Sequence, residues 1–228
     1  DLTQGENNVL VGYNAGVNIT TGSDNTFVGE QSGQALTTTA SNTFIGRRAG
    51  QAATSATENV IVGSDAVKTG VLTGDHNVIM GQSAGLNMTS AADNVIIGHD
   101  STLGVLTGAS NTIMGADSAK ALTSGHSSVI IGQNAGAALT TGHSVVFIGQ
   151  AAGDGHDTEH DNLGIGRAAL GGAVAGGEFN VAVGNYALDA LTSGDFNTVL
   201  GYNAGSGLTD SGYNVLIGKD AGLVTNGG

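Results

Sequence analysis

Residues 25–41 read NTFVGEQSGQALTTTAS, and residues 42–50 start the same pattern again with NTFIGRRAG. The glycine that closes NTFVG recurs thirteen times along the chain, at intervals of 17 residues with only two of 18. These glycines are Gly12, Gly29, Gly46, Gly63, Gly81, Gly98, Gly115, Gly132, Gly149, Gly166, Gly184, Gly201 and Gly218. A fixed period of this kind is typical of repeat architectures. We therefore expect residues 1–228 to form a single repeat array.

The positions within each repeat predict one short strand. Three consecutive positions before the glycine are mostly apolar and rich in β-branched residues, as in Val60-Ile61-Val62. Such a run, bounded by glycine, is too short for a helix and favours a strand. A second apolar position follows seven residues after the glycine, as at Leu36, and then a turn rich in Thr, Ser and Gly. Each repeat is thus expected to hold a strand, a glycine turn, a second short extended segment and another turn.

One short strand per repeat cannot bury a hydrophobic face by itself, but stacked repeats bury a continuous one. The sequence therefore predicts an all-β fold, a β-solenoid (β-roll or β-helix) of thirteen 17-residue coils. Asn stands four residues before the glycine in eleven repeats, and Ser128 and Val145 replace it in the other two. The side-chain amides of these Asn residues either form a ladder that bonds neighbouring coils, or the Asn is a turn residue with left-handed backbone geometry.

Composition excludes several classes of protein. The 40 glycines lack a three-residue period and there is no proline, which excludes collagen. There is no cysteine, so disulfides and thiolate metal sites are excluded. A net charge of −13 with only six Lys and Arg argues against nucleic-acid binding. The longest apolar runs are far too short for membrane insertion, and we predict no cofactor.

Side chains alternate across a strand, so the first and third strand residues share one face and the middle residue points the other way. We expect the outer pair, such as Val9 and Val11, to fill the interior and the middle residues to form an apolar stripe outside. A stripe of this length should be covered by another chain, most simply in a parallel homotrimer. The opposite assignment of the two faces is the alternative. The predicted interface residues are Leu10, Phe27, Phe44, Ile61, Ile79, Ile96, Ile113, Ile130, Phe147, Ala182, Val199 and Leu216.

The repeat Asn-Thr-x-x-Gly-x-x-Ala-Gly-x-x-Leu-Thr-Thr-Gly resembles repeats of phage tail fibres and related bacterial surface proteins. It occurs here as residues 25–33 followed by Leu36-Thr37-Thr38, and again as residues 197–205 followed by Leu208-Thr209. It is also similar to the head repeats of trimeric autotransporter adhesins, which form trimeric left-handed β-rolls. The resemblance covers all thirteen repeats, although the 17-residue coil is longer than the adhesin repeat. It implies a trimeric shaft or head.

One repeat carries an unusual number of titratable groups. Residues 154–161 read DGHDTEHD, where His156 replaces the usual Leu. Asp154, His156, Asp157 and His160 are candidate metal ligands because carboxylates and imidazoles are the ligand types that metals use. His126, His143 and His160 are 17 residues apart and should stack. A solvated acidic loop is the favoured interpretation of this repeat, so we predict no metal site. These acids, with Glu159, have no aromatic platform for a sugar, so we predict no enzyme.

A recurrent Thr suggests a second function. Thr occurs beside the second turn of many repeats. A flat ladder of Thr side chains can order water as ice-binding surfaces do. The alternative is that Thr is simply a good strand and turn residue. These positions are Thr20, Thr37, Thr54, Thr89, Thr123, Thr140, Thr192 and Thr209.

The favoured hypothesis is a structural segment of a trimeric phage tail fibre or bacterial surface adhesin. Its expected location is extracellular, at a cell surface or on a virion. It would act as a shaft or attachment surface, with a host receptor or glycan as a further partner. The array begins within a repeat and ends without a polar cap, so we expect it to be part of a longer fibre.

Overall fold

The computed structural model describes residues 5–172 and 177–223, which form a parallel β-solenoid. This part of the chain contains short strands and turns but no helix, and so no helix able to cross a membrane. It divides into two compact units, Asp1–Ala116 and Asp117–Gly228, each built from the same coil. The predicted all-β solenoid with one strand in each repeat is confirmed.

Every strand has three residues and ends directly before the repeated glycine. The first unit holds β1 (Val9–Val11), β2 (Thr26–Val28), β3 (Thr43–Ile45), β4 (Val60–Val62), β5 (Val78–Met80), β6 (Val95–Ile97) and β7 (Thr112–Met114). The second unit holds β8 (Val129–Ile131), β9 (Val146–Ile148), β10 (Leu163–Ile165), β11 (Val181–Val183), β12 (Thr198–Leu200) and β13 (Val215–Ile217).

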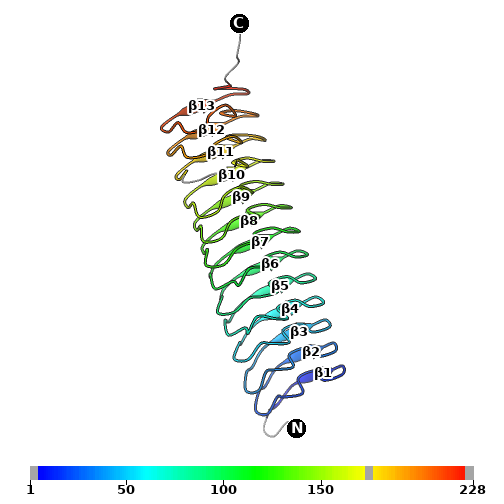
Figure 1. The fold of residues 1–228 in the computed structure, drawn as a ribbon. Coiled ribbons are helices and arrows are strands. Elements are labelled where there is room, and N and C mark those ends of the chain that lie inside the picture. Colours follow the sequence, from blue (N-terminus) through cyan, green and yellow to red (C-terminus); the bar gives the residue numbers. More distant parts are fainter. Residues whose placement is uncertain (1–4, 173–176, 224–228) are drawn as a thin grey trace. The chain divides into compact units, whose positions relative to one another are not determined.

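Within each unit, consecutive strands pair in parallel (Figure 1). Each strand residue lies beside its equivalent in the next coil. Phe27 pairs with Phe44, for example, and Val28 with Ile45. The backbone ladder also continues outside the strands, where the Gly33 N–H donates to the Ala49 carbonyl at 3.0 Å. The expected second extended segment is instead a series of turns and bends. The apolar residue that it contains, such as Leu36, is nevertheless fully buried.

The repeated glycine is required by both conformation and space. Gly29 has φ +134°, a region that L-residues with a Cβ rarely adopt. A Cβ placed there would lie 2.4 Å from the Gly46 carbonyl oxygen of the next coil. The coils can therefore approach closely at this corner only without a side chain.

Longer coils leave the sheet register unchanged. The coil from Gly63 to Gly81 has 18 residues, yet Val60 still pairs with Val78. Before the extra residue, the Val67 N–H donates to the Ala84 carbonyl as its equivalents do in other coils. After it, the Leu72 carbonyl accepts from the Thr54 N–H, a role that Thr37 has for Thr20. The extra residue is thus accommodated between Val67 and Leu72, on the corner away from the strand.

The interior is filled by the middle residue of each strand, which corrects our expectation. Phe27 and Phe44 are fully buried, with ring centroids 5.0 Å apart. Of the twelve predicted interface residues, ten are fully buried inside their own chain: Phe27, Phe44, Ile61, Ile79, Ile96, Ile113, Ile130, Phe147, Ala182 and Val199. Leu10 and Leu216, in the first and last strands, are half-buried. The outward stripe predicted at these positions is wrong, and the first and third strand residues face outward instead.

The recurrent Asn explains which face is inside. Within each unit the Asn amides form a buried ladder: Asn42 Nδ2 donates to Asn25 Oδ1 at 3.2 Å, and Asn77 Nδ2 donates to Asn59 Oδ1 at 2.9 Å. The side-chain oxygen also accepts the next Asn backbone N–H, as from Asn94 to Asn77 at 3.0 Å. The ladder alternative is therefore confirmed. Because the Asn lies two residues before the middle strand residue, alternation places both side chains on the same, inner face.

Candidate interaction face

The first and third residues of strands β1–β13 form the outer surface of the sheet, which we call the sheet face. None of these positions carries a charged residue, although the chain has 19 acidic residues and six Lys and Arg. The face consists of Val, Ile, Leu and Met with four Thr. Several of its side chains are substantially exposed, among them Val11 at 55% and Leu200 at 49%. An uncharged outward face is unusual for a surface that only meets water.

Two rows of side chains border the sheet face, and both carry charges. The leading rim is the residue two positions before each strand: Asn7, Asp24, Ser41, Glu58, His76, Asp93, Ser110, Ser127, Ser144, Asp161, Phe179, Phe196 and Tyr213. The trailing rim is the residue two positions after each strand: Tyr13, Glu30, Arg47, Ser64, Gln82, His99, Ala116, Gln133, Gln150, Arg167, Asn185, Tyr202 and Lys219. The leading rim has four acids and no Lys or Arg, whereas the trailing rim has three of the six Lys and Arg.

Every leading-rim residue has a left-handed backbone, with φ between 56° and 62°. This conformation is sterically costly for residues with a Cβ. The coil-to-coil hydrogen bonds hold it in place, as when the Asp93 N–H donates to the Asp75 carbonyl at 3.1 Å. The left-handed turn that we weighed for the Asn therefore falls on the residue before it.

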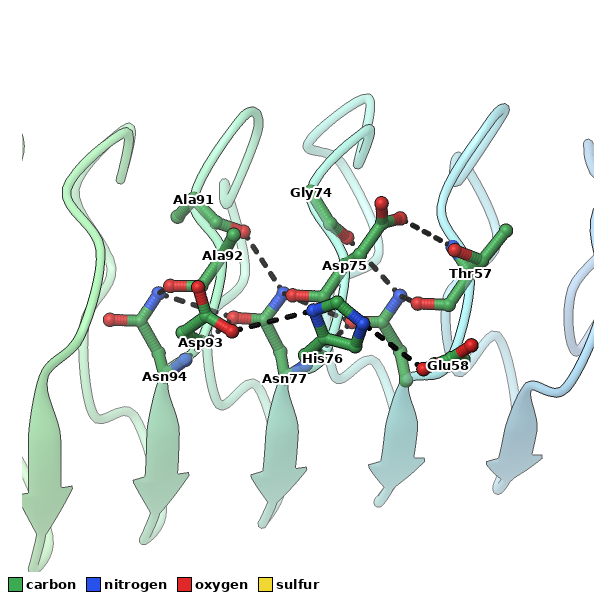
Figure 2. Close-up of polar contacts among 11 residues, drawn as sticks. Thr57, Glu58, Gly74, Asp75, His76, Asn77, Ala91, Ala92, Asp93 and Asn94 are labelled. Atoms are coloured by element: carbon green, nitrogen blue, oxygen red, sulfur yellow. Dashed lines mark hydrogen bonds and ion pairs between the residues drawn. The ribbon is translucent and has the colours of Figure 1, made fainter.

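His76 on the leading rim bridges three coils (Figure 2). Its Nε2 lies 3.0 Å from Glu58 Oε2, and its Nδ1 lies 3.4 Å from Asp93 Oδ1. All three side chains are more than half exposed. Asp75 fixes the adjacent backbone, since its Oδ1 accepts the Thr57 N–H at 2.7 Å. These are surface contacts in a solvated setting, and each contributes little to stability.

Aromatic rings stack beside the sheet face in the second unit. The expected stack of His126, His143 and His160 is present, with centroids 4.7 and 4.8 Å apart. On the leading rim itself, Phe179 and Phe196 stack with ring centroids 5.0 Å apart. Tyr213 stacks on Phe196 at 5.1 Å and is 81% exposed. Because the rings cover one another's faces, they present mainly edges to solvent.

Among the residues that the structure describes, His156 is the one titratable side chain that is completely buried. It points inward and meets the Phe147 ring edge-on, with centroids 4.9 Å apart. Neither ring nitrogen makes a hydrogen bond of good geometry. Burial lowers the pKa of His156 to about 4, although the nearby Glu159 carboxylate and the Leu170 backbone act in the opposite direction. The imidazole is therefore neutral at pH 7 and serves as part of the core.

The other candidate metal ligands point to different partners. Burial raises the pKa of the Asp154 carboxyl, with a partial offset from backbone N–H groups. Asp157 accepts a bond from the Thr140 hydroxyl, and His160 lies 2.9 Å from both Asp161 Oδ2 and Glu178 Oε1. Across residues 5–172 and 177–223, no three His, Cys, Asp or Glu side chains are placed to hold one metal ion. The described part of the chain also has no pocket.

Glu159, which we expected in a solvated loop, is 3% exposed. Its carboxylate folds back and accepts the backbone N–H groups of Asp157 and Thr158 at 2.8 and 3.1 Å. It therefore stabilises the turn of its own coil.

Most of the predicted Thr ladder supports the stack of coils. The hydroxyl of Thr20 donates to the Thr37 carbonyl at 3.2 Å, and that of Thr192 donates to the Thr209 carbonyl at 2.7 Å. Thr89, Thr123 and Thr140 make the equivalent bond. These donors are directed to the next coil instead of to a lattice of water outside.

Our sequence reasoning missed the sheet face and its rims because it placed the wrong strand positions outside. The recurrent Asn could have identified them. It lies two residues before the middle strand residue, so both side chains point to the same face of the strand. In comparisons with known proteins, the chain matches no protein-family model, no curated protein and no solved structure. Its class is therefore defined by the fold alone, a parallel β-solenoid repeat protein.

Proposed function

We propose that this chain is a structural, non-enzymatic segment of a homotrimeric fibre of the phage tail-fibre or bacterial surface-adhesin kind. It would act outside the cell or on a virion as a shaft or an attachment surface. The observation that carries the proposal is the sheet face, where two outward positions in every strand are free of charge. The interface thus moves from the middle strand residues to the first and third.

The free energy gained by burying this face is of the same order as the cost of association. Its side chains are already partly covered by their neighbours, so each has roughly 0.5 kcal/mol still to gain from complete burial. Two such side chains from each of the thirteen strands bring roughly 10 kcal/mol or more per chain. The free energy gained by burial is comparable with the cost of association, about 4–15 kcal/mol, so a stable oligomer is feasible. Within each unit, a three-fold axis along the stack would enclose three sheet faces in one apolar core.

The test is the mass of the assembly and its response to a charge on the sheet face. Sedimentation of the unmodified chain should give a trimer. Ile131→Lys on β8 should raise the dissociation constant at least a hundredfold, because a lysine ammonium would be buried without a partner.

Ala138→Lys is the matched control, since Ala138 is exposed on the far corner of the same coil. This variant should stay trimeric, and both variants should keep the β circular dichroism signal. A folded unmodified chain that sediments as a monomer at micromolar concentration would refute the proposal. Thermal hysteresis in that same monomer would point to the ice-binding alternative.

A further inference from the structure

Two methionines lie on the sheet face, and we propose that they are sites of reversible oxidation that oppose association of the chain. Met80 ends β5 and is 40% exposed, and Met114 ends β7 and is 38% exposed. The oxidant is a hydroperoxide such as hydrogen peroxide, and the product is methionine sulfoxide. The inference rests on the proposed self-association and adds a covalent modification that controls it.

The two thioethers lie in one row of the sheet face. Met80 pairs with Ile97 of β6, and Ile97 pairs in turn with Met114. These three residues therefore occupy the same position on consecutive strands, which Figure 1 shows as neighbouring coils of the first unit. The two methionines are about 10 Å apart, which is twice the strand spacing. Oxidation of both would thus change one small area of the face.

The row of third strand residues is otherwise entirely aliphatic. In the other eleven strands this position holds Val, Ile or Leu, so the row offers no hydrogen-bond donor from a side chain. A thioether is only weakly polar and packs well among such side chains. A sulfoxide instead carries a strong hydrogen-bond acceptor, and burying it between copies without a donor costs free energy. Oxidation therefore opposes burial of this row.

The composition and the fold both direct an oxidant to Met80 and Met114. The chain has no Cys and no Trp, so no thiol competes for the peroxide. It has three methionines, and the third, Met88, is fully buried inside its own coil. Since the reaction requires access to sulfur, Met80 and Met114 should be oxidised first and Met88 last.

The reaction is an oxygen transfer that needs no cofactor. A lone pair of the thioether sulfur attacks one oxygen of the peroxide, the O–O bond breaks and an S–O bond forms. The departing hydroxide takes the proton of the transferred oxygen and leaves as water, so sulfur is oxidised and the peroxide is reduced. A thiol-dependent methionine sulfoxide reductase reverses the modification. Because assembly would cover both sulfur atoms, oxidation acts on the dissociated chain.

The test combines mass spectrometry of the methionines with sedimentation of the assembly. The unmodified chain is diluted until it dissociates, treated with hydrogen peroxide, and then freed of peroxide and concentrated. Met80 and Met114 should each gain one oxygen atom roughly tenfold faster than Met88 does. The dissociation constant of the oxidised assembly should be roughly tenfold higher or more, because each buried sulfoxide lacks a donor. Treatment with the reductase should restore the original value.

Met80→Ile/Met114→Ile is the matched control, since Ile occupies the same position in β6, β8 and β9. This variant should associate as the unmodified chain does, and peroxide should leave its dissociation constant unchanged. Met80→Gln/Met114→Gln places a neutral polar side chain of similar length at both positions. It should weaken association without any peroxide.

An oligomer that keeps its dissociation constant after both methionines are oxidised would overturn the inference. So would an equal response to peroxide in Met80→Ile/Met114→Ile and the unmodified chain, because other side chains would then be responsible. A folded, unmodified chain that is monomeric before any oxidation would instead refute the proposed function. The two failures are therefore distinguishable.

Discussion

At the scale of single residues, His156 shows how strongly the coil selects side chains by position. It lies seven residues after its glycine, where the preceding coil buries Leu139. The position is apolar and closed, so the imidazole is buried without a good hydrogen bond, against Phe147. An unsatisfied polar group at such a site costs free energy that an apolar side chain would not.

Replacing His156 with Leu should stabilise the protein and change its response to acid. The pKa of this His falls from 6.5 to about 4 on folding, so the unfolded chain binds the proton more readily. Its contribution to stability is therefore fully present above pH 6.5 and is lost as the pH falls toward 4, by about 3 kcal/mol in all. His156→Leu should lose less stability between pH 7 and pH 4.5 than the unmodified chain does.

Urea unfolding at the two pH values measures this difference. The control is His99→Leu, a change at a side chain that is 54% exposed, and it should retain the unmodified chain's acid response. An equal loss of stability in His156→Leu and the unmodified chain would contradict the assignment.

At the scale of elements, the Asn ladder and the three-residue strand act as one unit. The strand alone offers few hydrogen bonds, and each Asn adds a side-chain link to the coil on either side. Asn77 Nδ2 donates to Asn59 Oδ1 at 2.9 Å and to the Ala91 carbonyl at 2.9 Å, while its Oδ1 accepts from Asn94. Identical amides in register can satisfy one another inside a narrow core.

Asn77→Ala should therefore destabilise the first unit by about 3 kcal/mol or more, because buried partners in both neighbouring coils lose their bonds. Hydrogen exchange should locate the effect. The backbone N–H of Asn94, which donates to Asn77 Oδ1, should exchange faster in the variant. Ser128→Ala is the comparison, since a natural Ser already shortens the side chain there, and it should cost about 1 kcal/mol. Equal effects of the two variants would argue against a continuous ladder.

The same column explains what could be predicted from the sequence. The strand positions could be predicted, because Gly29 and its equivalents are sterically required at a fixed spacing and each strand ends directly before one of them. The inward face was not readable from hydropathy, because Val60, Ile61 and Val62 are equally apolar. Ile61 lies two residues after Asn59, so their side chains share a face. This identifies the inner face only when the Asn59 amide is known to be buried. The burial of Glu159 was not predictable either, since a turn of its own backbone accommodates its carboxylate.

At the scale of the whole molecule, the proposed assembly would set burial of the apolar sheet face against repulsion between the net charges of the copies. Each copy carries −13 at pH 7, so three copies in close contact repel one another. The balance should therefore depend on ionic strength.

Added salt should tighten the assembly, because screening weakens repulsion between net charges more than it weakens burial of aliphatic side chains. We expect the dissociation constant to fall at least tenfold between about 0.01 and 0.15 M salt, where the Debye length shortens from about 30 to about 8 Å. Sedimentation equilibrium across this range measures it. A dissociation constant that rises with salt would contradict this prediction.

The coil from Gly63 to Gly81 has a practical consequence for engineering. Its extra residue lies between Val67 and Leu72, while Val60 and Val78 stay paired. Coil length and sheet register are thus set independently. Peptides could then be grafted at Lys68, which lies in the segment that accommodates the extra residue, without a change in the strand register. Within a unit, the protein could then display guest sequences at regular distances, which are multiples of the strand spacing of about 4.8 Å.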